Sequence, residues 1–234
     1  VKKSKYNNIF KVKTDQDYKD MINSWANNEN SSKEHTFKTV MQYAENHKME
    51  NCDIGYDVIY AMIDQPGNNT TKPFKNHKWN QPILFADYDL GRNGYAYVDT
   101  VSADYHVDGG DWTKWNSGNY YRNDGVDIEK NTDNVNSNGF HVGFVNKGEW
   151  MKYTVQVDET AVYKATIRVA AQENGGEFYL SMDDQEVTTI QTVSSTGGWS
   201  TFTTIEVLDI ILEEGKHSLK LHFSNSIPFT ISSI

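Results

Sequence analysis

Two aromatic residues stand out in this chain because each lies beside turn-forming residues. Phe144 follows a glycine within residues 139–155, a segment whose pattern predicts a strand, a turn at Lys147 and Gly148, and a second strand. Trp199 directly follows two glycines in a loop formed by residues 195–199. An aromatic ring held at a loop presents a flat apolar face with a negative quadrupole, which suits the polarised C–H groups of a pyranose ring. The two residues therefore indicate recognition of a sugar by stacking.

The residue pattern gives no positive sign of catalysis or of a transition metal. The seven His residues are scattered without ligand spacing, and no nucleophile elbow, phosphate loop or dinucleotide fingerprint occurs. Paired carboxylates for glycoside hydrolysis stay open as an alternative, because their spacing is set by the fold and is invisible in the sequence. Four loop carboxylates, which could together bind calcium but more often belong to plain Asp/Asn/Gly loops, are Asp108, Asp111, Asp124 and Asp127. We expect no catalytic residue, no metal and no cofactor in this chain.

Several separate blocks resemble, in the right order, the family 6 carbohydrate-binding modules, small β-sandwiches usually appended to bacterial glycoside hydrolases. The blocks are residues 82–91, 121–129, 148–155 and 195–199, so the resemblance covers about residues 82–234. Residues 1–80 resemble no family that we recognise.

The resemblance implies which side chains contact the sugar. Phe144 stands where these modules carry a stacking Tyr or Trp, and Trp199 matches the opposing loop tryptophan, so the two rings would clamp one sugar unit. The family also uses a polar residue, commonly Asn, near the C-terminus. Here Asn225 lies in that loop, and Thr230 takes the place where Asn would be expected. Burial of Phe144 in a strand and an ordinary turn role for Asn225 stay open as alternatives.

Many relatives also hold a structural calcium between an opening Glu-x-Glu and a carboxylate near the C-terminus. This chain has Leu84 and Ala86 at the opening and Ser232 and Ser233 at the end. A hard cation needs several oxygen ligands, and the carboxylates that would neutralise its charge are missing. We therefore expect that calcium site to be vacant.

Strict alternation of apolar and polar residues predicts the scaffold for residues 81–234, a jelly-roll β-sandwich in a mainly β chain. The alternating apolar positions are Val155 and Val157, Tyr163 to Val169, Phe178 to Met182, and Leu219 to Phe223. Turn clusters such as Asp183-Asp184 separate these runs. Trp150 and Tyr153 are expected in the core, and residues 97–138 are expected to form long surface loops.

Residues 1–80 show helical periodicity instead, which predicts a small α-helical segment followed by a linker or extended strap from residue 68 to residue 80. The two apolar stripes, at i, i+3, i+4 and i+7, are Tyr18, Met21, Ile22 and Trp25, then Phe37, Val40, Met41 and Ala44. A third helix is expected from Ile54 to about Ile63. Because three helices make a marginal core, we expect this segment to dock on something else, and the end of a catalytic domain is one candidate for its origin.

Composition narrows the partners and the cellular location. A net charge of −10 without a basic stripe argues against nucleic acid and anionic membranes as partners. Cys52 is the single cysteine, so an internal disulfide is excluded. No apolar run is long enough for a membrane span, and the first residues lack a signal-peptide core, so we expect a processed or excised chain from a secreted or cell-surface bacterial protein.

These observations predict a non-catalytic module that binds a polysaccharide or oligosaccharide and targets an attached glycoside hydrolase to its substrate. One alternative is a C-terminal fragment of a hydrolase in which the sandwich is mainly structural. Another is a cell-surface protein-interaction module.

Overall fold

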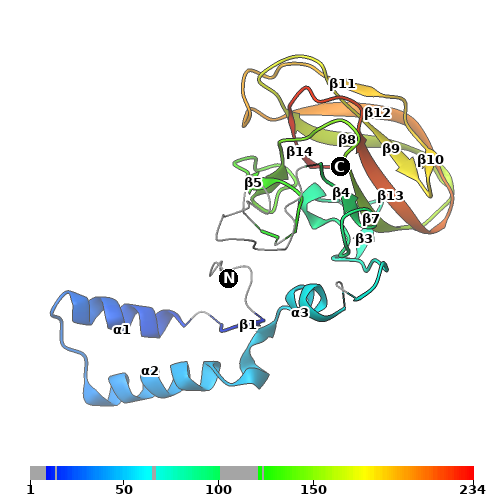
Figure 1. Cartoon of the computed structure of the whole chain (residues 1–234). Coiled ribbons are helices and arrows are strands. Elements are labelled where there is room, and N and C mark those ends of the chain that lie inside the picture. Colours follow the sequence, from blue (N-terminus) through cyan, green and yellow to red (C-terminus); the bar gives the residue numbers. More distant parts are fainter. Residues whose placement is uncertain (1–8, 14, 65–66, 101–120, 123) are drawn as a thin grey trace, which may run out of the picture. The chain divides into compact units, whose positions relative to one another are not determined.

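The computed structural model describes residues 9–234 apart from residues 14, 65–66, 101–120 and 123. The chain divides into two compact units, Val1–Ile59 and Tyr60–Ile234, and each is described by itself (Figure 1). None of the helices in the described ranges combines the length and the apolar composition needed to cross a membrane.

The first unit is a helical hairpin with a small two-stranded sheet. Its elements are β1 (Phe10–Lys11), α1 (Gln16–Ala26), α2 (Lys33–Asn46), the short helix η1 (Met49–Asn51) and β2 (Asp53–Ile54), which pairs with β1. Side chains cap both long helices, because Asp15 accepts from Tyr18 N at 3.0 Å and Ser32 accepts from His35 N at 3.2 Å. The rings of Tyr18 and Tyr43 stack with centroids 3.7 Å apart and join the two helices.

The helix pair does not bury the apolar stripe predicted for α2. Thr39 is buried in the hairpin, whereas Phe37 is 69% exposed and Met41 is 53% exposed. The pattern located the helix correctly, but Thr39 and Tyr43 lie on the side that meets α1 and the more apolar side faces away. A hairpin whose apolar stripe stays in water gains little free energy from its own packing.

The strap after α3 (Tyr56–Ile63) belongs to the second unit. Lys72 pairs with Leu90 in an isolated bridge, and β3 (His77–Lys78) runs parallel to a strand of the sandwich. His77 Nε2 also lies 3.0 Å from the carbonyl oxygen of Asp87. These bonds place the division between units earlier than the predicted boundary after residue 80, because the extended strap is tied to the sheet by its backbone.

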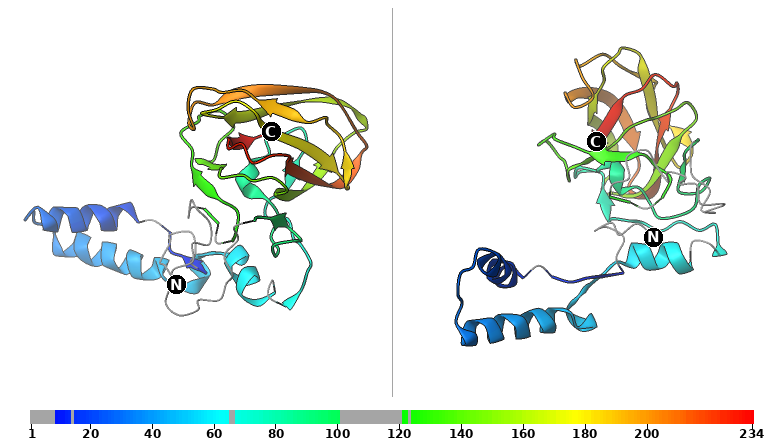
Figure 2. Two further views of the ribbon diagram at one scale, coloured as in Figure 1. Left: turned by 45° about the horizontal axis from the view of Figure 1, so that its top comes forward. Right: turned by 60° about the vertical axis from the view of Figure 1, so that its left-hand side comes forward.

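The second unit is a β-sandwich of two mainly antiparallel sheets, and the predicted mainly β fold is confirmed (Figure 2). One sheet has the order β10-β9-β13-β7-β3, with β11 also paired to β9 and β4 to β7, and the other has the order β12-β8-β14-β6-β5. The strand bounds are β4 Tyr97–Val98, β5 Ile128–Lys130, β6 Phe140–Val142, β7 Trp150–Val157, β8 Ala161–Ala170, β9 Gly176–Met182, β10 Gln185–Glu186, β11 Gln191–Val193, β12 Thr203–Leu212, β13 Gly215–Phe223 and β14 Thr230–Ser233.

Alternation decides which side chains fill the space between the sheets. In β7 every second residue is buried, beginning with Met151 and Tyr153, and the Tyr153 hydroxyl donates to the Phe85 carbonyl oxygen at 2.8 Å. Trp150 was expected in this core as well, but residues three apart on a strand face opposite sides. Its ring is only partly buried, and Lys220 Nζ lies 4.7 Å from the ring centroid.

Residues 97–138 and the C-terminal segment both contribute to the sandwich in ways that the sequence did not predict. The expected long loop of residues 97–138 contains β4 and β5 and contributes the buried residues Tyr97 and Ile128 to the core. At the other end of the sandwich, Ile83 N donates to Ile234 O at 2.9 Å and Ile234 N donates to Ile83 O at 3.0 Å. The first and last segments of the sandwich are therefore paired with each other.

Candidate functional site

The ends of β6 and β14 bring three of the four predicted site residues to one end of the second sheet. Ile231 pairs with Val142, so Thr230, the first residue of β14, lies beside Gly143, which precedes Phe144. The Thr230 hydroxyl lies 3.0 Å from the Trp199 carbonyl oxygen and 3.2 Å from the Ala170 carbonyl oxygen. Thr230 thus joins the strand that leads to Phe144 to the loop that carries Trp199.

Phe144 lies outside the core and has an unusual backbone. Its side chain is 50% exposed, and its φ of 52° is in the left-handed region that non-glycine residues seldom occupy. Asn146 Nδ2 donates to the Phe144 carbonyl oxygen at 3.1 Å and helps to hold this turn. Strain at one exposed aromatic residue is often connected with function.

Trp199 is held by a loop whose backbone is well bonded. Gly197 has a φ of 88°, and both Thr196 N (2.8 Å) and Gly198 N (3.3 Å) donate to the Ala171 carbonyl oxygen. The Trp199 side chain is 42% exposed. A ring on such a loop offers contact area to a ligand at a small loss of conformational entropy.

Asn225 uses its polar atoms inside the protein. Its Nδ2 donates to the Gly175 carbonyl oxygen at 2.7 Å, and its Oδ1 accepts from Ile227 N at 3.2 Å. The next residue, Ser226, accepts from Lys147 N at 3.0 Å, so this loop borders the turn that follows Phe144. The structure places Asn225 beside that turn as a bonded loop residue.

Glu129 lies beside the predicted site residues, although sequence reasoning did not single it out. It pairs with His141 across β5 and β6, and its side chain is 39% exposed. A β-carbon on Gly143 would lie 3.4 Å from Glu129 Oε2 and 3.5 Å from Thr230 Cγ2. Gly143 is itself buried and is packed between the carboxylate of Glu129 and the methyl group of Thr230. The signal available in the sequence was an acidic residue at an outward position, directly after the buried Ile128.

His141 lies behind this carboxylate. The residue is 3% exposed, and its Nε2 is 3.6 Å from Glu129 Oε2. Burial lowers the pKa of His141 because it disfavours the charged ring, and the negative charge of Glu129 acts in the opposite direction.

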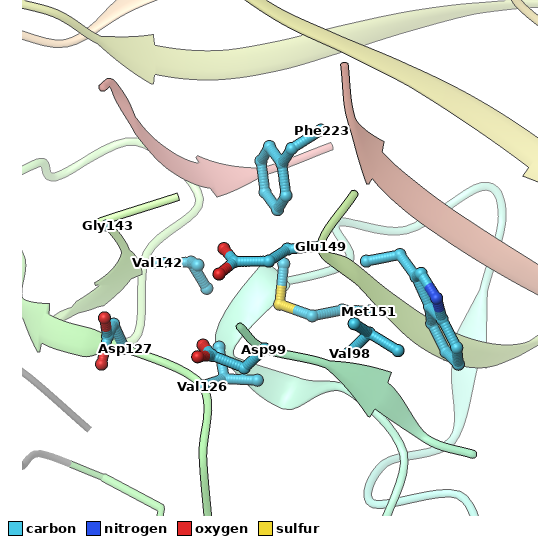
Figure 3. A pocket seen from close by; sticks show the side chains of 10 residues that line it. Val98, Asp99, Val126, Asp127, Val142, Gly143, Glu149, Met151 and Phe223 are labelled. Carbon is cyan, nitrogen blue, oxygen red and sulfur yellow. The ribbon is translucent and has the colours of Figure 1, made fainter. Parts of the chain in front are cut away.

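A small pocket adjoins Gly143 on the inner side of the sheet (Figure 3). Its lining includes the carboxylates of Asp99, Asp127 and Glu149. Glu149 accepts from Asn146 N at 2.7 Å and from the Thr100 hydroxyl at 2.7 Å. At about 10 Å³ the pocket has room for about one water molecule, so a sugar has to bind on the exposed surface.

The residues considered for calcium have other roles where they are described. Asp124 bonds Arg122 at 2.9 Å and accepts from the Tyr88 hydroxyl, and Leu84 pairs with Ser233 at the opening of the sandwich. Asp108 and Asp111 lie outside the described residues. Within the described ranges no three His, Cys, Asp or Glu side chains are grouped so that they could hold a metal ion.

Comparison with known proteins gives one family. The family described as carbohydrate binding module (family 6) matches residues 117–234. No curated protein matches the chain.

Solved structures of such modules are similar to this chain. A module from Cellvibrio mixtus lichenase 5A in complex with cellotriose is 26% identical, with a TM-score of 0.41 over 47% of this chain and 83% of that chain. A β-1,3-glucan-binding module from Bacillus halodurans is 18% identical, with a TM-score of 0.48 over 68% of this chain and 96% of that chain. A module from Clostridium cellulolyticum in complex with xylose is 26% identical, with a TM-score of 0.41 over 47% and 84%.

The family match spans half of the chain and includes Phe144, Gly143, Trp199 and Thr230, the residues that meet at one end of the second sheet. This chain belongs to family 6 of the carbohydrate-binding modules.

Proposed function

We propose that the sandwich is a non-catalytic module that binds a polysaccharide chain by holding one sugar unit between Phe144 and Trp199. The observation that carries this proposal is the position of Thr230. It bonds the loop of Trp199 and packs beside Gly143, which precedes Phe144, and both aromatic rings are about half exposed. Aromatic faces supply the contact area, and sugar C–H groups supply the matching surface.

Polar recognition falls to the groups that border Gly143. An ionised carboxylate only accepts hydrogen bonds. Glu129 is partly exposed beside Gly143, so its carboxylate can accept hydrogen bonds from sugar hydroxyls. The methyl group of Thr230 lies beside Gly143, and its hydroxyl bonds the Trp199 carbonyl oxygen. Asn225 holds its own loop through bonds to Gly175 and Ile227, and Ser226 of that loop bonds the turn that follows Phe144.

The biological role that we propose is targeting of an attached glycoside hydrolase. A tethered module of modest affinity raises the effective concentration of cleavable bonds near the enzyme. A family 6 module of another protein, the lichenase 5A of Cellvibrio mixtus, belongs to such an enzyme. Because polysaccharides of this kind lie outside the cell, we propose a secreted or cell-surface location in a bacterium.

Affinity electrophoresis with soluble β-glucan and xylan tests the clamp. Trp199→Ala should abolish retardation in the gel that retards the parent protein, since loss of an anchoring aromatic weakens binding by about 2 kcal/mol or more. Trp25→Ala is a matched control, because Trp25 is 46% exposed on α1 and should leave mobility unchanged. Unchanged mobility of Trp199→Ala in every such gel would contradict the clamp.

Gly143→Ala tests separately whether the surroundings of Gly143 contribute to sugar binding. Gly143 does not have a positive φ, and a β-carbon there makes contacts of 3.4 Å or longer, so the fold should tolerate the change. The methyl group would contact the Glu129 carboxylate and the Thr230 methyl group and shift the Glu129 acceptor, so retardation should weaken. Full retention by a folded Gly143→Ala protein would show that the sugar does not depend on the surroundings of Gly143.

A further inference from the structure

The surroundings of His141 leave its ring with an unusual lack of partners. Neither ring nitrogen has a hydrogen-bond partner among the described residues, although the ring is buried. It packs against Phe202, with ring centroids 5.7 Å apart. A buried polar group without a hydrogen bond destabilises a fold, so its presence needs an explanation.

One charged group faces this ring from the elements packed around it. Glu129 on β5 is 3.6 Å away, whereas the neighbouring β14 contributes the neutral Thr230 and Ser232. On β8, Arg168 is occupied by Asp133, with nitrogen-to-oxygen distances of 2.8 and 2.9 Å. The electrostatic partner of His141 is therefore Glu129.

Glu129 in turn lies between two competing environments. On one side is the buried His141 ring, and on the other is the molecular surface beside Gly143, where the Glu129 side chain is 39% exposed. The His141 Nε2 atom, 3.6 Å from Oε2, faces this carboxylate and donates to it once the ring is protonated. A sugar hydroxyl bound beside Gly143 and a protonated His141 ring would compete for the Glu129 carboxylate as hydrogen-bond acceptor.

We propose that His141 is a positioning residue that controls Glu129. While the imidazole is neutral, the Glu129 carboxylate accepts hydrogen bonds from a sugar over Gly143. Once the ring is protonated, it draws the carboxylate into an ion pair, and ligand affinity falls. The inference rests on the proposed function, because it concerns the same sugar site.

Burial of His141 determines the pH range in which its ring is protonated. The pKa of His141 lies below its usual value of about 6.5, so the ring is neutral at pH 7.5 and becomes protonated only on acidification. Ligand affinity should therefore be highest near neutrality. By reciprocity, bound sugar should lower the pKa of His141 further, because it favours the neutral ring.

Isothermal titration with cellotriose, xylotriose and laminaritriose between pH 7.5 and pH 5 tests the proposal. The parent protein should lose affinity for the tightest of the three as the ring takes up its proton, by up to about tenfold when protonation is complete, the loss that corresponds to about one hydrogen bond to a charged group. His141→Gln, which keeps a neutral donor, should bind within about threefold of the parent at pH 7.5 and show no such loss, because an amide does not titrate. His222→Gln is the matched control, since His222 lies on β13 in the other sheet and should keep the parent profile.

An NMR titration of the His141 ring provides a readout that does not depend on the folding of His141→Gln. Glu129→Gln should lower the pKa of His141, and so should saturating ligand in the parent protein. An identical pH profile for the parent and His141→Gln, or a His141 pKa that is unchanged in Glu129→Gln, would overturn this inference alone. Failure of the parent to bind any of the three sugars at pH 7.5 would overturn the proposed function, and this inference with it.

Discussion

Phe144 shows how one residue can separate binding from stability. Its ring is half exposed and its backbone is left-handed, so the fold gains little from the side chain and is strained by the β-carbon. Such a residue is costly to keep unless it contacts something outside the core. Core phenylalanines behave differently, because Phe178 is fully buried and fills space between the sheets.

Phe144→Gly should therefore change binding without much change in stability. Relief of backbone strain and the greater flexibility of glycine in the unfolded chain oppose each other, so the free energy of unfolding should stay within about 1 kcal/mol of the parent. Retardation by polysaccharide should be lost. Chemical denaturation measures the first quantity, with Phe178→Ala as a comparison that should lose about 3–5 kcal/mol.

The residues of the site were only partly visible in the sequence. Phe144 and Trp199 could be named as candidates because aromatic residues beside glycine in a turn are unusual locally. Glu129 could not be named, because its place beside these residues depends on cross-strand pairing with His141 and on the absence of a side chain at Gly143. Contacts of that kind join residues far apart in the chain and leave no local pattern.

At the scale of elements, β9 and β13 carry a row of polar side chains on the outer face of the first sheet. His222 on β13 stacks on Tyr179 with ring centroids 4.5 Å apart, and its Nε2 lies 2.8 Å from the Ser181 hydroxyl. Burial lowers the pKa of His222 to about 4, and the positive charge of Lys220 acts in the same direction. The folded state therefore favours the neutral ring.

This shift predicts a pH dependence of stability that belongs to β13. The unfolded chain takes up the proton near pH 6.5 and the folded chain near pH 4, so the stabilising contribution is complete above pH 6.5 and is lost as the pH falls between these values. His222→Gln should flatten the stability curve in this window. Urea denaturation at several pH values measures it, and an equally steep curve in the variant would assign the effect to other groups.

Strands were predicted more reliably than helix faces for a physical reason. In β7 one side is buried by the opposite sheet, so burial and sequence alternate together. In α2 most of the apolar stripe stays exposed among the described residues of its unit, and the pairing of Tyr18 with Tyr43 goes with burial of the other side. Strand β3 has two residues and thus no period to detect.

At the scale of the whole molecule, the strap of residues 68–80 changes which piece of the chain forms a complete sandwich. It supplies β3, the bond from Lys152 Nζ to the Thr71 hydroxyl at 2.6 Å, and the buried His77 beside Tyr153. A sandwich that starts at residue 82 exposes the edge of β7 that β3 covers. Unpaired strand edges promote association between molecules.

A protein of residues 60–234 should consequently melt at a higher temperature than a protein of residues 82–234. The difference should be several degrees, since loss of even 1 kcal/mol lowers the melting temperature of a domain of this size by about 2–4 °C. Calorimetry measures both melting temperatures. Equal values would show that residues 82–234 fold as well alone as the sequence suggested, and that the strap adds nothing.

The pairing of Ile83 with Ile234 has a consequence for synthesis. Because the last strand lies in the interior of its sheet, between β8 and β6, translation of the second unit has to be complete before that sheet can close. Until then the nascent chain presents open strand edges, and distant segments must find each other slowly. Until residue 234 has been made this unit is an unfinished sheet, and chaperones that hold exposed strands should associate with it during that interval.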